Sequence, residues 1–412
     1  MDIKPKLRAC VGLVTPAFDR GGLEQVVLNL YRGYKTAGLD SLVLVESNVS
    51  AYMASLTDDE EDVVIFRDDE RIFLEECFAR NVTHLHYHYS TFALAEASSI
   101  GIHTTYTLHN VYTWLDDHEF ARRAKIIAAA NRIVAVSASV RNYFCARSGL
   151  ALHKVEIIEN GVDFNELVEG RPIRRTDLAL PASPFLFASI ASFHRNKHHA
   201  VIIRAAELLL RQRQDFHILM LGAEGDRTYF DEVKARLARS PAAEHITVQP
   251  PLPRDRMRSL YEDVVDCVLL PSLQEGCSNV LQEAVGFGRP IITTDVGHAA
   301  ETAQRFSGVT LIPNAFPDLL KLDAGMVDAL SREPEPSNAR ALADAMNKAI
   351  DAAPSPVGAD AQRRVRLSAD AMVESYLDGF KGGGATARAT ETNGLAVIEA
   401  RPIKPSSVEG FN

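Results

Sequence analysis

CVLLPSLQEGCSNVLQEAVGFGRPIITT, residues 267–294, contains an apolar run, a polar loop, a helix-length segment and a second apolar run in direct succession. The apolar runs, 267–270 and 291–294, have the length of buried strands, and residues 279–287 have the length of a helix. A strand, a helix and a strand in this order are typical of a parallel βαβ unit. The stretch therefore predicts a parallel sheet covered by helices.

The same alternation continues through most of the chain and divides it into two series. The predicted strands are residues 9–15, 42–45, 63–66, 83–88, 104–108, 133–136 and 155–158, then 185–190, 217–221, 246–249, 267–270, 291–294 and 309–312. The predicted helices include residues 23–34, 200–211, 255–262, 279–287, 339–352 and 369–380. We expect an α/β fold of two tandem Rossmann-like domains, with a ligand crevice between them at the carboxyl ends of the strands.

The length of the chain and its polar stretches suggest where these domains end. A chain of 412 residues is long enough for two domains. We predict an N-terminal domain over residues 1–170, a linker over 171–184 and a C-terminal domain over 185–355. Residues 356–380 predict a final helix that crosses back to the first domain. Residues 381–412, rich in Gly, Ala, Thr, Ser and Pro, predict a disordered tail.

The composition narrows the class of protein. A net charge of −10 argues against nucleic-acid binding, which needs a basic surface. No apolar run approaches the roughly 20 residues of a membrane span, and the short apolar run after Lys4, Lys6 and Arg8 predicts a strand rather than a signal peptide. The five cysteines have neither pairing nor ligand spacing, which favours a reducing compartment and hence the cytoplasm.

The loop between the two quoted strands has the chemistry of a site for phosphate and sugar. Its backbone N–H groups would point out of a helix N-terminus, which favours phosphate or sugar oxygens, and these residues are Gly276, Cys277, Ser278 and Asn279. Glu275 can accept hydrogen bonds from sugar hydroxyls, and Glu283, about two turns further along, can accept two from a ribose diol. The alternative is that two surface glutamates flank a helix start and one of them serves as a cap.

This segment resembles the Glu-x7-Glu motif of retaining GT-B glycosyltransferases, particularly family four, the glycosyl transferases group one. Residues 288–297 continue the resemblance. In that family the first glutamate contacts the donor sugar and the second contacts the ribose, which implies these roles for Glu275 and Glu283. The resemblance further implies a UDP- or GDP-sugar as donor substrate and a glycan or glycolipid acceptor.

Two segments of the first half match the same family. Gly21 and Gly22, between the first strand and a helix, resemble its N-terminal glycine-rich loop, although a glycine pair is equally compatible with a plain turn. His109 resembles the crevice histidine that contacts the donor sugar near the reaction centre. Upstream, His84, His86 and His88 alternate along one strand and share a face, but three histidines on one strand do not converge on a metal without other ligands.

A basic stretch after the first strand of the second series resembles the family's diphosphate-binding segment. Lys197 occupies the position of the family's lysine, whereas Ser192 stands where the usual arginine would be. Arg195 is then the candidate to replace that arginine from a shifted position. The alternative is a solvated basic loop.

Together these features predict a glycosyltransferase. The candidate catalytic residues are His109, Lys197 and Glu275. No Asp-x-Asp sequence occurs in the chain, so we expect protein groups rather than a metal to neutralise the diphosphate, and no cofactor. The alternatives are a sugar-nucleotide epimerase of the same fold and a non-catalytic nucleotide-sugar-binding protein. Family relatives that act on lipid-linked acceptors also make peripheral contact with the inner membrane face an expectation to test.

Overall fold

The computed structural model describes residues 9–19, 21–168, 172–352 and 361–382, and it confirms the predicted α/β fold with two parallel sheets. The first sheet has the order β3-β2-β1-β4-β5-β6-β7 and the second has the order β10-β9-β8-β11-β12-β13. The strands of the first sheet are β1 (Cys10–Phe18), β2 (Asp40–Val49), β3 (Val63–Ile65), β4 (Val82–His88), β5 (His103–Leu108), β6 (Arg132–Ala135) and β7 (Val155–Ile157). Those of the second are β8 (Phe185–Ile190), β9 (Phe216–Leu221), β10 (Ile246–Gln249), β11 (Cys267–Leu270), β12 (Ile291–Thr294) and β13 (Val309–Ile312).

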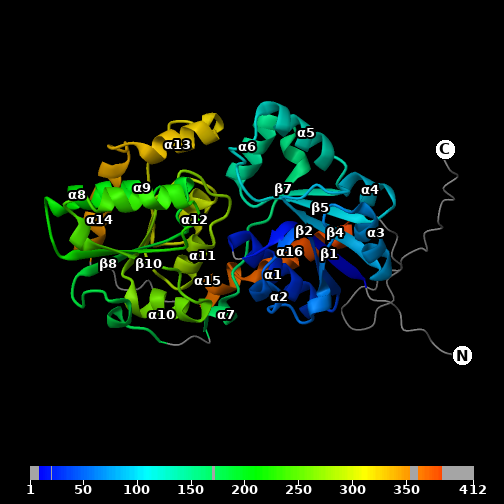
Figure 1. Ribbon diagram of the computed structural model, residues 1–412, viewed down its shortest axis with the longest axis horizontal. Helices are drawn as coiled ribbons and strands as arrows, with labels where there is room; N and C mark the ends of the chain where they lie inside the picture. The colour runs from blue at the N-terminus through cyan, green and yellow to red at the C-terminus, as the bar shows by residue number, and fades with distance from the viewer. Residues whose placement is uncertain (1–8, 20, 169–171, 353–360, 383–412) are drawn as a thin grey trace, which may run out of the picture. The chain divides into compact units, whose positions relative to one another are not determined.

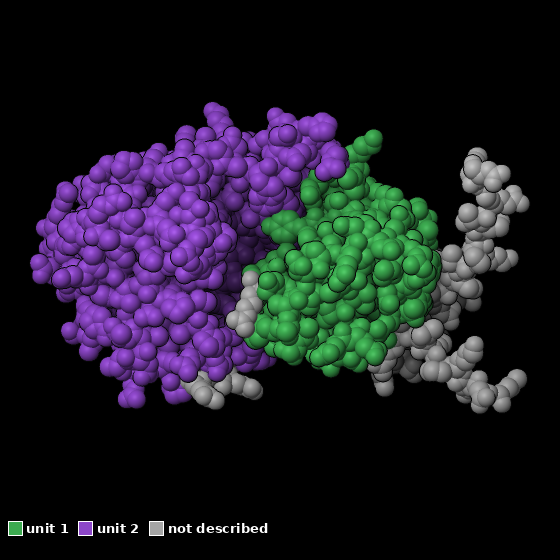
Figure 2. Space-filling model, in the orientation of Figure 1, with its two compact units in different colours: residues 1–107, 123–133, 373–412 green, residues 108–122, 134–372 purple. Residues whose placement is uncertain are grey.

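The chain divides by its internal contacts into two compact units, which Figure 2 colours separately. Unit 1 consists of residues 1–107, 123–133 and 373–412, and unit 2 consists of residues 108–122 and 134–372. The predicted domain boundaries separate the two series of strands, whereas the two units are defined by internal contacts. The boundaries therefore stay a prediction. Most of the predicted tail, from residue 383 onward, lies outside the described residues.

Unit 1 is organised around the parallel strands β1, β2 and β4 and the helix that follows β1. Helix α1 (Gly22–Thr36) buries one apolar stripe, which consists of Val26, Val27, Leu30, Tyr31 and Tyr34. The predicted last helix is present as α16 (Ala369–Gly382), and a Cβ on Gly33 of α1 would lie 2.3 Å from the side chain of Val373. Only glycine therefore allows this close approach of α1 to α16.

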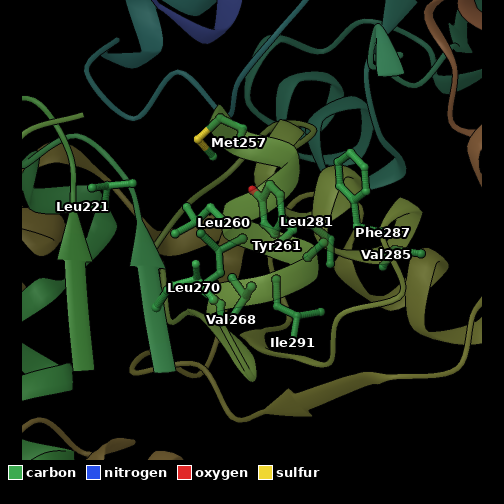
Figure 3. Packing of buried hydrophobic residues seen from close by; sticks show 14 of the residues in the cluster. Leu221, Met257, Leu260, Tyr261, Val268, Leu270, Leu281, Val285, Phe287 and Ile291 are labelled. Carbon is green, nitrogen blue, oxygen red and sulfur yellow. The ribbon is translucent and has the colours of Figure 1, made fainter. Parts of the chain in front are cut away.

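Unit 2 buries both faces of its six-stranded sheet because alternate residues of each strand point to opposite sides. On one face, Val268, Leu270 and Ile291 pack with Leu281 and Val285 (Figure 3). The opposite face packs under α8 (His199–Leu210), α9 (Arg227–Leu237) and α14 (Ala339–Ala352). Figure 1 shows α9 and α10 on opposite sides of this sheet. Both faces are thus apolar, as a buried parallel sheet requires.

The helices differ from the predictions at a few places. The segment predicted as a helix over 255–262 forms only a short α10 (Met257–Ser259) and then a π-helical turn over Leu260–Val264. Helix α11 (Asn279–Gly286) ends one residue earlier than predicted, and α14 has the predicted bounds. No helix in the described ranges is long and apolar enough to cross a membrane.

Candidate functional site

Lys197 and Glu275 form the centre of the site in unit 2. Lys197 ends the short η4 turn (Arg195–Lys197) after β8, and Glu275 lies in the loop between β11 and α11. The Nζ of Lys197 donates to Oε1 of Glu275 at 2.6 Å, and the Oγ of Ser272 donates to the same oxygen at 2.7 Å. Because parallel strands end at the same edge of a sheet, these two loops meet there, and the N–H of Leu273 donates to the carbonyl of Asn196 at 2.7 Å.

Glu275 keeps one carboxylate oxygen uncommitted. The residue is 8% exposed, and both of its protein donors reach Oε1. Within the described part of the chain, Oε2 has no hydrogen-bond partner. A carboxylate oxygen accepts about two hydrogen bonds, so Oε2 can accept from a ligand hydroxyl without breaking the Lys197 pair.

Glu283 lies on α11 and is held by a different cation and hydroxyl. Arg254 donates from Nη1 to Oε1 at 2.8 Å, and the hydroxyl of Tyr261 donates to Oε2 at 2.8 Å. Glu283 is 2% exposed. Burial opposes the charged form of Arg254, but Glu283, together with Glu166 and Tyr261, more than compensates and raises the pKa of this guanidinium. The carboxylate of Glu283 is therefore paired and fixed in orientation.

The loop 276–278 is fastened by the chain's own residues. Asn160 Nδ2 donates to the carbonyl of Cys277 at 3.2 Å, and Gln282 Nε2 donates to the carbonyl of Asn160 at 2.5 Å and to Cys277 Sγ at 3.5 Å. The N–H of Ser278 donates to Nδ1 of His298 at 3.3 Å. Of the backbone amides predicted to bind phosphate, that of Ser278 is thus already occupied. The Oγ of Ser278 caps α11 by accepting from the N–H of Leu281.

Residue 276 must be glycine because the backbone of the segment that carries His109 approaches it closely. A Cβ on Gly276 would lie 1.9 Å from the carbonyl oxygen of His109. The two residues belong to the same unit, and Thr113 further along this segment donates to Gln274 at 2.7 Å. Burial lowers the pKa of His109 to about 3, so its ring is neutral at neutral pH. The structure therefore brings His109 together with the Glu275 loop.

Arg195 does not share the environment of Lys197. Its guanidinium donates to both oxygens of Glu232, at 2.8 and 3.0 Å, and lies 3.1 Å from Asp328. The same guanidinium is 5.3 Å from the ring centroid of Tyr229. It also lies 3.6 Å from Asp226, so to reach a diphosphate it would have to leave three carboxylates. Its predicted donor contact stays a prediction, and the observed contacts give it a structural role between η4, α9 and α13 (Ala324–Arg332).

Gly21 and Gly22 belong to unit 1, whereas Lys197 belongs to unit 2. Gly21 precedes α1 in extended conformation, and Gly22 is its first residue. A Cβ on Gly21 would lie 2.3 Å from Oε2 of Glu24, so this carboxylate occupies the space beside the glycine. Burial raises the pKa of Glu24. A carboxylate at this helix N-terminus takes the position that a phosphate would favour.

The row of histidines on β4 is built into the packing of unit 1. The ring centroids of His84 and Phe380 lie 4.3 Å apart with the rings tilted, and the two ring nitrogens of His86 lie within hydrogen-bond distance of Tyr34 and Thr107. Among the described residues, no group of three or more His, Cys, Asp or Glu side chains is arranged to hold a metal ion.

Sequence reasoning missed four residues that complete the site, which are Arg254, Tyr261, Gln282 and His298. Arg254 follows β10, at the same edge of the sheet as the loops of Lys197 and Glu275. Its position after a strand could have indicated from the sequence that it belongs to the site. The contacts of Gln282 and His298 depend on which loops meet, which no local pattern encodes. Burial and, to a lesser degree, Arg305 lower the pKa of His298 to about 3. Its Nδ1 accepts from Ser278, so the ring proton is on Nε2.

Two family models match the chain over most of the described residues. The model described as Glycosyl transferases group 1 matches residues 171–323, and the model described as Glycosyltransferase Family 4 matches residues 20–166. Among curated proteins, the chain is 26% identical over 232 residues to D-inositol 3-phosphate glycosyltransferase of Arthrobacter sp., covering 53% of this chain and 55% of that protein. It is 22% identical over 307 residues to the putative glycosyltransferase EpsF of Bacillus subtilis, covering 68% of this chain and 78% of that protein. The chain thus spans about half the length of the first of these relatives.

Solved structures share the fold at low identity. The chain is similar to Anabaena Alr3699/HepE, solved in complex with UDP and glucose, with a TM-score of 0.70 and 16% identity over 91% of this chain and 100% of that one. It is also similar to a glycosyltransferase from Rickettsia africae, with a TM-score of 0.72 and 17% identity over 91% of this chain and 98% of that one. These similarities establish the fold.

Proposed function

Because the chain belongs to the family of glycosyl transferases group 1, we propose that it is a retaining glycosyltransferase. It moves a hexose-type sugar from a nucleotide-sugar, a UDP- or GDP-sugar, to a hydroxyl of a glycan or glycolipid acceptor. The observation that carries this proposal is the ion pair of the half-buried Lys197 with the buried Glu275, with a second buried glutamate, Glu283, on the adjoining helix. The UDP and glucose bound by the Anabaena relative support a nucleotide-sugar as donor.

In this proposal, different residues of unit 2 bind the diphosphate, the sugar and the ribose of the donor. Lys197 stabilises the negative charge that develops on the departing diphosphate, which is the electrostatic contribution expected of a preorganised cation. The free Oε2 of Glu275 accepts a hydroxyl of the transferred sugar, and Glu283 accepts the ribose diol. The neutral ring of His109 hydrogen-bonds the sugar next to the reacting carbon.

Retention follows, in this proposal, from attack of the acceptor hydroxyl on the face that the diphosphate leaves. The leaving phosphate takes the proton of that hydroxyl, so no side-chain nucleophile is needed. Protein cations neutralise the diphosphate, and we propose that a metal ion is not required. The sequence supports this because it contains no Asp-x-Asp cluster.

The proposed setting is the biosynthesis of a glycan, a polysaccharide or a glycolipid in the cytoplasm. All five cysteines are free, which fits a reducing compartment. An acceptor that carries a lipid would place the reaction at the inner face of the membrane.

The test has two steps and separates the three candidate activities. UDP- and GDP-sugars are first screened for a rise in melting temperature, because a ligand that binds the native state stabilises it. The stabilising donor is then incubated with and without a panel of sugar and lipid-linked acceptors. Transfer predicts release of free nucleoside diphosphate only with an acceptor, in buffer with EDTA. Isomerisation of the donor without acceptor would identify an epimerase, and binding without any turnover would identify a nucleotide-sugar-binding protein.

A further inference from the structure

A basic cavity lies in unit 2 between the end of α12 (Ala299–Arg305) and α15 (Ala361–Arg366). Its volume is about 220 Å³. It is lined by Arg305, Phe306, Ser307, Gln362, Arg363 and Arg366. Three of these six described residues are arginines and none is acidic. The cavity is formed by different residues from those around Lys197 and Glu275.

Two of the three arginines are fixed by neighbouring groups. Arg363 donates from Nη1 to the carbonyl of Ser307 at 3.3 Å and from Nη2 to its Oγ at 2.7 Å. Arg305 donates from Nη2 to both oxygens of Glu159, at 2.7 and 2.6 Å. Arg366, in contrast, forms no hydrogen bond or ion pair with any described residue. A guanidinium without a partner at the wall of a cavity is available to an anion.

The segment that carries this cavity contrasts with the rest of the chain in charge. Residues 361–368, AQRRVRLS, contain three arginines and no acidic residue, whereas the chain has a net charge of −10. Leu367 is 2% exposed in the core of unit 2 and fixes the segment, while Val365 is 68% exposed. An exposed apolar side chain between arginines is the pattern of a surface that touches a lipid headgroup layer.

We propose that this cavity binds the phosphate group of an anionic ligand, and that the ligand is a phospholipid headgroup. Guanidinium groups suit phosphate because their planar fork donates two parallel hydrogen bonds. Arg366 and Arg363 supply the charge, Ser307 borders the site, and Val365 rests on the lipid surface. The proposal does not depend on the transferase activity, because binding is measured without a donor.

The test compares sedimentation of the full chain with vesicles of phosphatidylcholine alone and with vesicles that also contain phosphatidylglycerol. We expect binding only to the anionic vesicles, and weaker binding at high salt because surface charges are screened. Arg366→Ala should lower the affinity about fivefold. The matched control is Arg340→Ala, since Arg340 is exposed on α14 and should leave binding unchanged.

A second measurement separates a lipid from a free phosphate. Broadening of the phosphorus NMR signal of inorganic phosphate reports binding in solution, and Arg366→Ala should abolish it. Val365→Ser should reduce vesicle binding but not phosphate binding. Phosphate binding without vesicle binding would support the cavity and overturn the lipid as its ligand. Equal effects of Arg366→Ala and Arg340→Ala, or no binding in either measurement, would overturn the proposal.

Discussion

The Glu275 region consists of Glu275, Lys197 and Ser272, and the Glu283 region consists of Glu283, Arg254 and Tyr261. Both regions combine a carboxylate, a cation and a hydroxyl, but they arrange these groups differently. In each region a buried glutamate accepts from one cation and one hydroxyl. In the Glu275 region both donors reach one oxygen, whereas in the Glu283 region each oxygen has its own donor.

This difference separates a carboxylate with a free oxygen from one with a fixed orientation. A free oxygen can take up a ligand hydroxyl whose charge distribution changes during reaction, which is the requirement for stabilising a transition state. A carboxylate held at both oxygens by protein donors presents a constant surface to a ligand, which suits binding in the ground state. We therefore expect the Glu275 region to control turnover and the Glu283 region to control donor affinity.

The largest effect is expected at the cation of the Glu275 region. Lys197→Ala removes the charge that stabilises the leaving diphosphate and leaves Glu275 without its cation, so kcat should fall about 10²- to 10³-fold. Steady-state kinetics with the identified donor measures it. Arg195→Ala is the control two residues away, because the guanidinium of Arg195 pairs with Glu232 and Asp328 instead of Glu275. This variant should lower the melting temperature and leave kcat nearly unchanged. If Arg195→Ala reduced kcat as much as Lys197→Ala, Arg195 would be a donor ligand.

The two glutamates should separate in their kinetic effects. Glu275→Gln should reduce kcat with little change in donor Kd, whereas Glu283→Gln should raise donor Kd about 10- to 100-fold, the cost of a lost charge-assisted hydrogen bond. Titration calorimetry gives Kd and initial rates give kcat. Glu335→Gln, on an exposed side chain, is the matched control and should change neither. Identical kinetic profiles for the two glutamate variants would eliminate the distinction between the regions.

The sequence predicted the sheets better than the site. Runs such as residues 185–190 are apolar because both faces of the sheet are buried, so burial alone identifies them as strands. Glu275, Glu283 and Lys197 could be named because each follows a strand and matches a family segment. Arg195 illustrates the limit, since its partners Glu232 and Asp328 are distant in sequence and only tertiary structure brings them together.

The loop 276–278, which follows Glu275, should be sensitive to acid through its contact with His298. His298, which accepts from Ser278, is 1% exposed and has a pKa lowered to about 3 by burial. In the unfolded chain the ring of His298 binds a proton near pH 6.5, whereas in the folded chain it stays neutral down to about pH 3. The free energy of unfolding therefore falls as the pH decreases from about 6.5 toward 3. When the pH is lowered from about 7.5 to 5, the free energy of unfolding of the parent should fall by about 2 kcal/mol more than that of His298→Gln.

Urea denaturation, followed through the fluorescence of the single tryptophan, Trp114, measures this difference. Tyr261→Phe leaves His298 and its contact with Ser278 in place, so it should have the same pH dependence of stability as the parent. An equal loss in the parent and in His298→Gln would show that other groups determine the acid sensitivity.

The smallest effect is expected at the hydroxyl of the Glu283 region. Tyr261→Phe removes one donor to Oε2 of Glu283 and leaves the ring packed against Leu260 and Leu281 (Figure 3). One hydrogen bond of this kind is worth about 0.5–1.5 kcal/mol, so donor Kd should rise about two- to tenfold while kcat stays constant. In this variant Arg254 is the remaining partner of the two that hold Glu283. The carboxylate should therefore be less fixed in orientation but still paired. A fall in kcat at unchanged Kd would mean that Glu283, like Glu275, acts on the transition state, because only an interaction made there changes kcat alone.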